Sequence, residues 1–258
     1  MPLDAGPPAT GPPDASAWPH ALPATVIFDF DGVVLDSNRL KTDAFGRVLA
    51  EAGFSAATVV RFLAYQARNF GRSRYLLFDD FLRDFAGEEP GERDRERLLA
   101  AFGRACVDGY GDVPETEGVR DLLDALRQRG ARLFVASGSD QEELRGVVAV
   151  RGLAGSFDEV LGAPMRKTDC VRTILAGLGE PTQAARAAWF VGDAVADLQA
   201  AEDHGVPFVY VRRYSNVQDL FDGELAARCA CVVETPGVLA ARLAALAPGP
   251  NTAQASAR

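Results

Sequence analysis

Residues 24–33 of the chain read ATVIFDFDGV. The run that ends at Phe28 is apolar and rich in β-branched and aromatic residues, which is typical of a strand buried on both faces of a sheet. Asp29 and Asp31 follow it directly, and Gly32 permits a tight turn behind them. In an open parallel sheet, ligands bind beyond the carboxyl ends of the strands. The stretch therefore predicts a parallel sheet with a ligand site at its edge, where two like charges require a partner.

Four further short apolar runs, each bounded by turn residues, predict additional strands. With the first run they give strands over 24–28, 132–136, 188–191, 208–211 and 231–233, separated by helical patterns such as 118–129, 168–178 and 194–204. Alternation of this kind is typical of βαβ units. The expected fold class is therefore α/β, with a doubly wound parallel sheet.

One long segment breaks this alternation. Residues 40–111 carry helix-like patterns but no convincing strand, so we expect an inserted all-helical domain at 39–113 and a core made of 23–38 and 114–246. Seven of the fifteen prolines lie before residue 25, and such a composition buries too little apolar area to fold. A disordered leader is expected over 1–22 and a disordered tail, with small polar residues, over 247–258.

Composition excludes several classes of function. The 27 basic residues against 36 acidic ones give a net charge of −9, which opposes binding to nucleic acid. Two histidines are too few for a poly-histidine zinc site, and four scattered cysteines do not form a disulfide framework. No secretory signal and no apolar run of membrane-spanning length is present. We expect a cytoplasmic protein without a membrane partner, whose chemistry rests on carboxylates.

Polar groups follow the other predicted strands as well. Ser137, Gly138 and Ser139 come after the second run, in a turn that offers hydroxyl and N–H groups to an anion. Ser139 also starts a pattern that resembles a capping box, so it is expected to cap the next helix. Asp193 and Asp197 follow a later strand at helical spacing, although an acidic first turn favoured by the helix dipole would have the same pattern.

These motifs together resemble the haloacid dehalogenase superfamily of phosphotransferases. The resemblance rests on DxD at Asp29 and Asp31, Ser137, Lys167, and GDxxxD at 192–197, in the family's order and over most of the chain. Each motif alone is weak, but the ordered set is specific. Members with a small helical cap insert it after the first motif, where the strandless segment 39–113 lies. The expected fold is thus a Rossmann-like core with an inserted helical cap.

The resemblance implies a role for each motif residue. Asp29 is implied to be the nucleophile that forms an aspartyl phosphate, and Asp31 the acid and base that exchanges protons with the leaving group and water. Ser137, Gly138 and Lys167 are implied to bind the phosphate, with Arg166 as the alternative to Lys167. A Mg²⁺ cofactor is implied at Asp29, Asp193 and the backbone carbonyl of Asp31, with Asp197 in a supporting position behind the metal ligands.

The cap is expected to contribute to substrate recognition. Its stretch QARNFGRSRY at 66–75 holds three arginines in an otherwise acidic protein. The substrate candidates are Arg68, Asn69, Arg72 and Arg74. A solvated basic turn would have the same composition. The sequence also leaves two roles for Arg39 and Lys41, contact with an anionic substrate or an ion pair with a neighbouring acid.

Three functions fit these residues. The first is a Mg²⁺-dependent phosphatase that acts on a small-molecule phosphate ester. Residues 28–45 together with the cap run 69–75 resemble phosphatases associated with sugar phosphates, and this resemblance implies a sugar or polyol phosphate as the substrate. The second is a phosphomutase of the β-phosphoglucomutase type, which uses the same aspartyl phosphate. The third is a catalytically silent binding partner with the same fold. Dehalogenase and phosphonate-cleaving relatives lack an acid at the position of Asp31, so they are disfavoured. Oligomeric state is not indicated.

Overall fold

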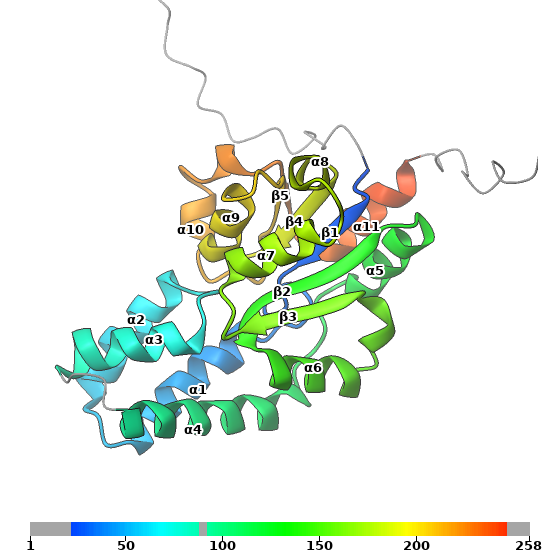
Figure 1. Cartoon of the computed structure of the whole chain (residues 1–258). Coiled ribbons are helices and arrows are strands. Elements are labelled where there is room, and N and C mark those ends of the chain that lie inside the picture. Colours follow the sequence, from blue (N-terminus) through cyan, green and yellow to red (C-terminus); the bar gives the residue numbers. More distant parts are fainter. Residues whose placement is uncertain (1–21, 88–91, 247–258) are drawn as a thin grey trace, which may run out of the picture.

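The computed structural model describes residues 22–87 and 92–246. The tail expected over 247–258, and the leader expected over 1–22 except for Leu22, lie outside these residues. At the centre of the described part is one parallel sheet of six strands in the order β3-β2-β1-β4-β5-β6 (Figure 1). The strands are β1 (Thr25–Phe28), β2 (Arg132–Asp140), β3 (Glu159–Ala163), β4 (Ala188–Gly192), β5 (Phe208–Val211) and β6 (Cys231–Val233). The expected doubly wound α/β class is confirmed.

Alternate residues of the central strand face opposite layers of helices. Val26 and Phe28 pack in a core with α5 (Val119–Gln128), α6 (Gln141–Val150) and α11 (Pro236–Ala245). Ile27 packs in a second core with α7 (Lys167–Ala176), α8 (Pro181–Arg186), α9 (Val195–Glu202) and α10 (Gln218–Phe221). Two short 3-10 turns, Ala154–Ser156 and Ala226–Arg228, complete the core. Burial on both faces explains why the strands lack a polar face in the sequence.

The chain between β1 and β2 forms a helical cap beside one end of the sheet (Figure 1). It consists of α1 (Asn38–Glu51), α2 (Ala56–Arg68), α3 (Arg74–Asp80) with its π-helical continuation η1 (Phe81–Ala86), and α4 (Glu92–Tyr110). The described residues of 39–113 contain no strand, as expected. Phe45 of α1 packs against the rings of Phe62, Phe78 and Phe102, with centroids 4.2 to 5.7 Å apart. These aromatic contacts unite the four helices.

Two sequence expectations about the sheet are wrong. Strand β3 was not expected, because its five residues, EVLGA, start with the exposed Glu159 and include a glycine. The turn expected at 137–139 is instead part of β2, which continues as far as Asp140. Asp140, not Ser139, caps α6, since its side chain accepts hydrogen bonds from the N–H groups of Glu142 and Glu143. Ser139 is thereby free to point into the site.

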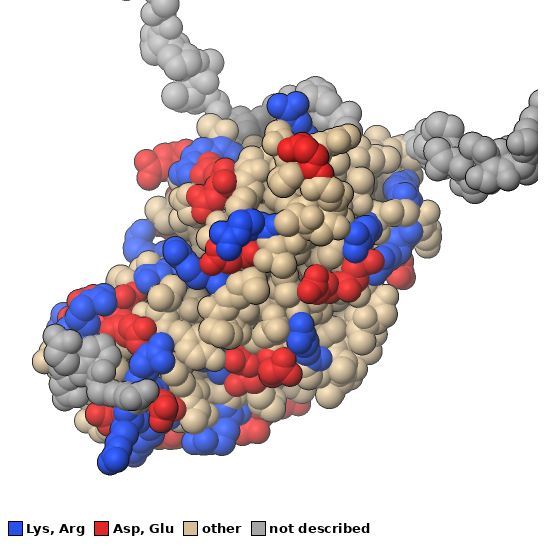
Figure 2. Space-filling view, in the orientation of Figure 1, with Lys and Arg blue, Asp and Glu red and all other residues tan. Residues whose placement is uncertain are grey.

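Acidic and basic side chains are interspersed on the face of the molecule shown in Figure 2. Such mixing creates no strong field of one sign there. Within the described residues, every helix is too short or too polar to cross a bilayer. The absence of nucleic-acid partners and the cytoplasmic location stay predictions.

Candidate active site

Asp29 lies at the carboxyl end of β1, at the centre of the sheet edge. Its backbone N–H donates to the carbonyl of Val191 in β4, 2.9 Å away, so its position is set by the sheet. Its buried Oδ1 accepts the N–H of Phe30 at 2.7 Å, and its Oδ2 lies 3.1 Å from Nζ of Lys167. Asp29 and Lys167, 138 positions apart in the sequence, thus form a buried ion pair.

Asp197 organises the loop after β4. Its Oδ2 accepts the backbone N–H groups of Asp193 and Ala194 at 3.0 and 2.9 Å, and its Oδ1 accepts a hydrogen bond from Lys167. A Cβ atom at Gly192 would collide with the Asp197 side chain, so the loop requires a glycine there. Both carboxylate oxygens of Asp197 are therefore occupied by protein donors, and the residue holds both the loop and Lys167 in place.

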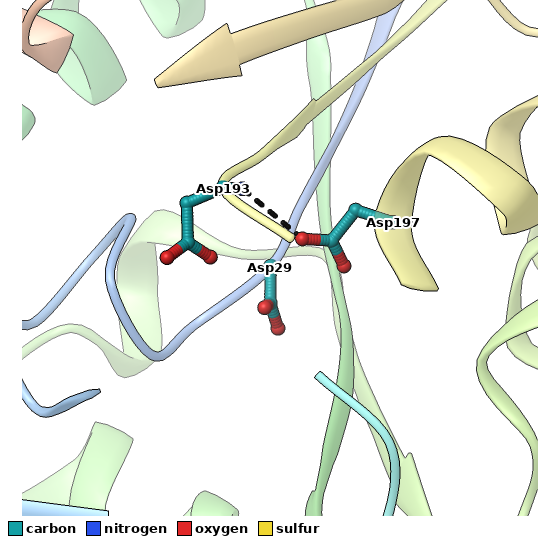
Figure 3. Close-up of side chains that lie close together, drawn as sticks. All are labelled: Asp29, Asp193 and Asp197. Atoms are coloured by element: carbon teal, nitrogen blue, oxygen red, sulfur yellow. Dashed lines mark hydrogen bonds between the residues drawn. The ribbon is translucent and has the colours of Figure 1, made fainter. Parts of the chain in front are cut away.

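Asp29, Asp193 and Asp197 form a buried cluster of carboxylates (Figure 3). One oxygen from each lies within 4.8 Å of the others. Oδ2 of Asp193 accepts a hydrogen bond from Asn38 at 2.6 Å, while its buried Oδ1 has no hydrogen-bond partner among the described residues. Buried carboxylate oxygens without donors are costly unless a cation binds them. The donor set consists of hard oxygens, which fits a Mg²⁺ ion held by Asp29 and Asp193.

The charge balance also indicates a cation. Burial, and then repulsion by Asp197, raises the pKa of Asp29 to about 7 despite the nearby Lys167. Burial and repulsion by Asp197 and Asp29 raise the pKa of Asp193 well above its usual value. Burial alone would lower the pKa of Lys167, but Asp197 and Asp29 outweigh it and raise that pKa. A single lysine thus faces three carboxylates, and a divalent cation would stabilise their ionised forms.

Asp31 points to a different set of partners. Its Oδ1 accepts hydrogen bonds from the hydroxyls of Ser37 and Tyr110 at 2.6 and 2.7 Å. Its Oδ2 accepts one from Ser139 at 2.7 Å and lies 3.3 Å from Nζ of Lys41. Burial alone would raise the pKa of Asp31, but Lys41 and the three hydroxyls outweigh burial and lower it. The two motif aspartates therefore occupy electrostatically opposite environments.

The loop between α2 and α3 covers this edge of the sheet. A Cβ atom at Gly138 would lie 2.5 Å from the carbonyl oxygen of Gly71, which shows how closely the cap approaches β2. Beneath the loop is a cavity into which Asp29, Asp31, Ser137 and Lys41 face. Its remaining walls are Phe45, Gln66, Phe70, Gly71, Arg72, Arg74, Leu77, Phe102, Gly138 and Ser139. A ligand in this cavity contacts both the core and the cap.

The cap substrate candidates divide into two pairs. Arg72 and Arg74 line the cavity, but each already has an acidic partner, Asp80 and Glu143 respectively. Arg68 and Asn69 line a neighbouring groove, which also includes Lys167 and Arg166. Arg68 is largely exposed, and its ion pair reaches Asp219 of α10 across 3.4 Å. Contact of any of these four residues with a substrate stays a prediction.

The structure distinguishes between site residues that the sequence analysis left as alternatives. Lys167 is buried between Asp29 and Asp197, whereas Arg166 is exposed. Lys41 faces Asp31, whereas Arg39 is exposed and pairs with Asp43 of the same helix. Asn38, Ser37 and Tyr110 were not expected at the site. Tyr110 has no local sequence signal, because its partner lies 79 positions away.

Comparisons with known proteins agree with this geometry. A family model described as haloacid dehalogenase-like hydrolase matches residues 23–205. The chain belongs to this family. It is 31% identical to the phosphoglycolate phosphatase of Rhodospirillum rubrum over 196 residues, which cover 73% of this chain and 79% of that protein. It is 27% identical to phosphoglycolate phosphatase 1 of Pseudomonas aeruginosa over 192 residues, covering 72% of this chain and 68% of that protein.

Solved structures share the fold of this chain. A hydrolase from Pseudomonas syringae superposes with a TM-score of 0.69 at 20% sequence identity, covering 86% of this chain and 99% of that one. At this identity the likeness concerns the fold. The expectation of an enzyme, a phosphatase of the haloacid dehalogenase superfamily with a helical cap, is thereby confirmed.

Proposed function

We propose that this haloacid dehalogenase-like hydrolase is a Mg²⁺-dependent phosphatase that hydrolyses a small phosphate monoester through an aspartyl phosphate. The observation that carries the proposal is the arrangement of Asp29, which faces the cavity beside Lys167 while Asp193 offers a buried, unpaired oxygen next to it. A nucleophile, a lysine ammonium group and an anionic metal site side by side at one edge of the sheet suit phosphoryl transfer.

The reaction balances with the residues at hand. A carboxylate oxygen of Asp29 attacks the phosphorus atom, so the O–P bond to Asp29 forms as the ester P–O bond breaks. Asp31, which is ionised in the free protein, takes up a proton as the anionic ester binds beside it and donates this proton to the leaving alkoxide. Water then attacks the phosphorus, Asp31 takes its proton, and the bond to Asp29 breaks to release phosphate. Ser137, the N–H of Gly138 and Lys167 hold the phosphoryl oxygens during both steps.

Asp29, Asp193 and the backbone carbonyl of Asp31 are the groups proposed to hold Mg²⁺. When bound, the ion would neutralise charge on the phosphoryl group and would favour the ionised form of Asp29. Asp197 contributes indirectly, since it fixes the backbone of Asp193 and the position of Lys167.

The proposed substrate class is a phosphate ester of a small polar alcohol. The cavity is closed on the cap side by Phe45, Phe70 and Phe102, which limits the size of the leaving group. The sugar and polyol phosphates implied by the resemblance of residues 28–45 and 69–75 belong to this class. So does 2-phosphoglycolate, the substrate in the names of the relatives from Rhodospirillum rubrum and Pseudomonas aeruginosa.

A release assay tests the proposal. Phosphate release from 2-phosphoglycolate and from a panel of sugar, polyol and nucleotide phosphates is measured with Mg²⁺ or EDTA, for the wild type and Asp29→Asn. We expect release that requires both Mg²⁺ and Asp29, with the highest kcat/KM on a compact ester. Mass spectrometry after rapid quenching should detect the phosphorylated chain. Isomerisation of a sugar phosphate primed with a bisphosphate would instead identify a mutase, and inactivity in both assays a non-catalytic partner.

A further inference from the structure

The carboxylate of Asp31 is held by four donors from separate parts of the chain. Ser37 precedes α1, Lys41 lies in α1, Tyr110 ends α4 and Ser139 lies in β2. Each carboxylate oxygen has two of these partners. Asp31 itself is 5% exposed, so its orientation is determined by these contacts and not by solvent.

Lys41 is unusual in this chain. The protein has 27 basic residues, of which only Lys41 and Lys167 are lysines. Both are buried, and each faces one of the two motif aspartates. The ammonium group of Lys41 is a compact point charge that contacts Asp31 Oδ2 and Ser139 Oγ at once. Lys41 Nζ also donates to Ser139 Oγ at 2.6 Å, and Ser139 Oγ in turn donates to Asp31, so the lysine fixes the aspartate both directly and through Ser139.

Tyr110, the last residue of the last cap helix, donates a hydrogen bond to the other carboxylate oxygen of Asp31. Its ring lies 5.3 Å from Nζ of Lys41 and packs edge-on against Phe30, 6.4 Å away. Lys41 and Tyr110 enter from the first and last helices of the cap. Asp31 is therefore fully held only while both ends of the cap lie against the core.

We infer that Lys41 and Tyr110 are positioning residues for Asp31. They hold its carboxylate in the one orientation from which it exchanges a proton with the leaving oxygen, and they couple that orientation to cap closure. This inference rests on the proposed function of Asp31 as acid and base. Lys41 and Tyr110 would therefore affect protonation of the leaving oxygen, the step that depends on leaving-group basicity, in addition to any effect on folding.

Leaving-group dependence tests this role. Lys41→Met and Tyr110→Phe are compared with the wild type on 2-phosphoglycolate, on 2-hydroxyethyl phosphate and on p-nitrophenyl phosphate, whose phenolate leaves without a proton. Because hydrolysis of the aspartyl phosphate is common to all three esters and also uses Asp31, the quantity compared is the single-turnover rate constant for phosphorylation of Asp29, measured as alcohol or phenol release after rapid quenching. We expect Lys41→Met to lower this rate constant about 100-fold or more on both alkyl esters, the magnitude typical of proton transfer, and less than about 3-fold on the aryl ester. Tyr110→Phe should show the same pattern with a smaller loss. Activity on the aryl ester also verifies that each variant is folded.

A double-variant cycle provides the second test. If Lys41 acts through Asp31, Lys41→Met should have no further effect on alkyl esters in the Asp31→Asn background. Equal losses of the phosphorylation rate constant on all three esters, or additive losses in the cycle, would overturn the inference in favour of a structural role. A loss on 2-phosphoglycolate alone would overturn it in favour of carboxylate recognition. A wild type that releases phosphate from none of the esters would instead refute the proposed function on which the inference rests.

Discussion

The side chain of Asn38, the first residue of α1, donates a hydrogen bond to Oδ2 of Asp193 across 155 positions of sequence. The same Nδ2 group also donates to the backbone carbonyl of Tyr214, 2.8 Å away. Asn38 is 2% exposed. One buried amide thus ties the start of the cap to the acidic loop after β4 and directs the other oxygen of Asp193 into the carboxylate cluster.

Replacement of Asn38 by Leu should weaken Mg²⁺ binding more than catalysis at saturating metal. The hydrogen bond to Asp193 lowers the pKa of that carboxyl, so its loss disfavours the ionised form that binds a cation. We expect about a 10-fold higher Mg²⁺ requirement, the size of effect typical when a group that orients a metal ligand is removed. Activity as a function of Mg²⁺ concentration provides the measurement. Asn216→Leu, at an exposed position, is the matched control. An unchanged Mg²⁺ requirement would show that Asn38 contributes to packing but not to metal binding by Asp193.

Gly32→Ala should damage both stability and the metal site. Gly32 has a φ of +79°, and a Cβ atom there would collide with Asp193 Oδ2 and lie 2.5 Å from Asn38 Nδ2. Gly53, with a φ of +91° and open space around its Cβ position, is the matched control. Gly53→Ala should cost only the backbone strain, about 1–2 kcal/mol, with Mg²⁺-dependent activity retained. Urea denaturation and activity are measured for both. Equal behaviour of the two variants would exclude a steric role for Gly32.

The sequence predicts the parts of this molecule whose signals are local. Strands β1, β2, β4, β5 and β6 are recognisable because burial on both faces makes each an uninterrupted apolar run. The first motif is predictable for the same reason, since Asp29 directly follows such a run. Strand β3 is missed because its five residues, EVLGA, begin with a charged residue and include a glycine, so they form no continuous apolar run. Its backbone pairing with β2 stabilises β3 as a strand, although its own composition does not favour one.

The expectations that depended on distant partners were less successful. Ser139 resembles a helix cap in its local sequence, yet its partners Lys41 and Asp31 lie 98 and 108 positions away. Tyr110 and Asn38 carry no local signal for the same reason. Arg74 was expected to face a substrate, and the structure places it at the cavity with its charge already paired to Glu143. Partner identity in a buried network follows from the fold and not from the neighbouring residues.

Mg²⁺ should stabilise the protein more strongly at high pH than at low pH. In the metal-free protein Asp29 has a pKa of about 7, against an ordinary value of 3.8. The folded state therefore retains a proton that the unfolded state releases, and this carboxyl makes the fold less stable as the pH rises from about 4 to 7. Bound Mg²⁺ favours the ionised form and removes that disadvantage.

Thermal unfolding at about pH 5 and pH 8 tests this dependence. At one fixed Mg²⁺ concentration, near 100 times the dissociation constant at pH 8, we expect a Tm increase of about 5–10 °C at pH 8 and a clearly smaller one at pH 5. Asp193→Asn, which lacks one proposed ligand, should show little increase at either pH. A Mg²⁺ effect of the same size at both pH values would contradict the assignment of the carboxylate cluster as the metal site.

Removal of Glu143 should lower the free energy of unfolding more than removal of Arg74, its ion-pair partner. Arg74 lies at the start of α3 in the cap and Glu143 in α6 of the core, and they are joined by two hydrogen bonds. The side chain of Arg74 is 5% exposed and that of Glu143 is 26% exposed. Space for the pair is provided by Gly103 of α4, where a Cβ atom would collide with Glu143 Oε1.

Glu143→Ala leaves a buried guanidinium whose Nε already has no partner among the described residues. The Glu143→Ala substitution should lower the unfolding free energy by about 3–5 kcal/mol, as is typical when a buried charge is left unpaired. Arg74→Met leaves a carboxylate that water can reach, and Met preserves the packing on the ring of Phe102, so a smaller loss is expected. Urea denaturation of both variants gives the comparison. If Arg74→Met proves the more destabilising, contacts of the arginine other than its pairing with Glu143 hold the cap against the core.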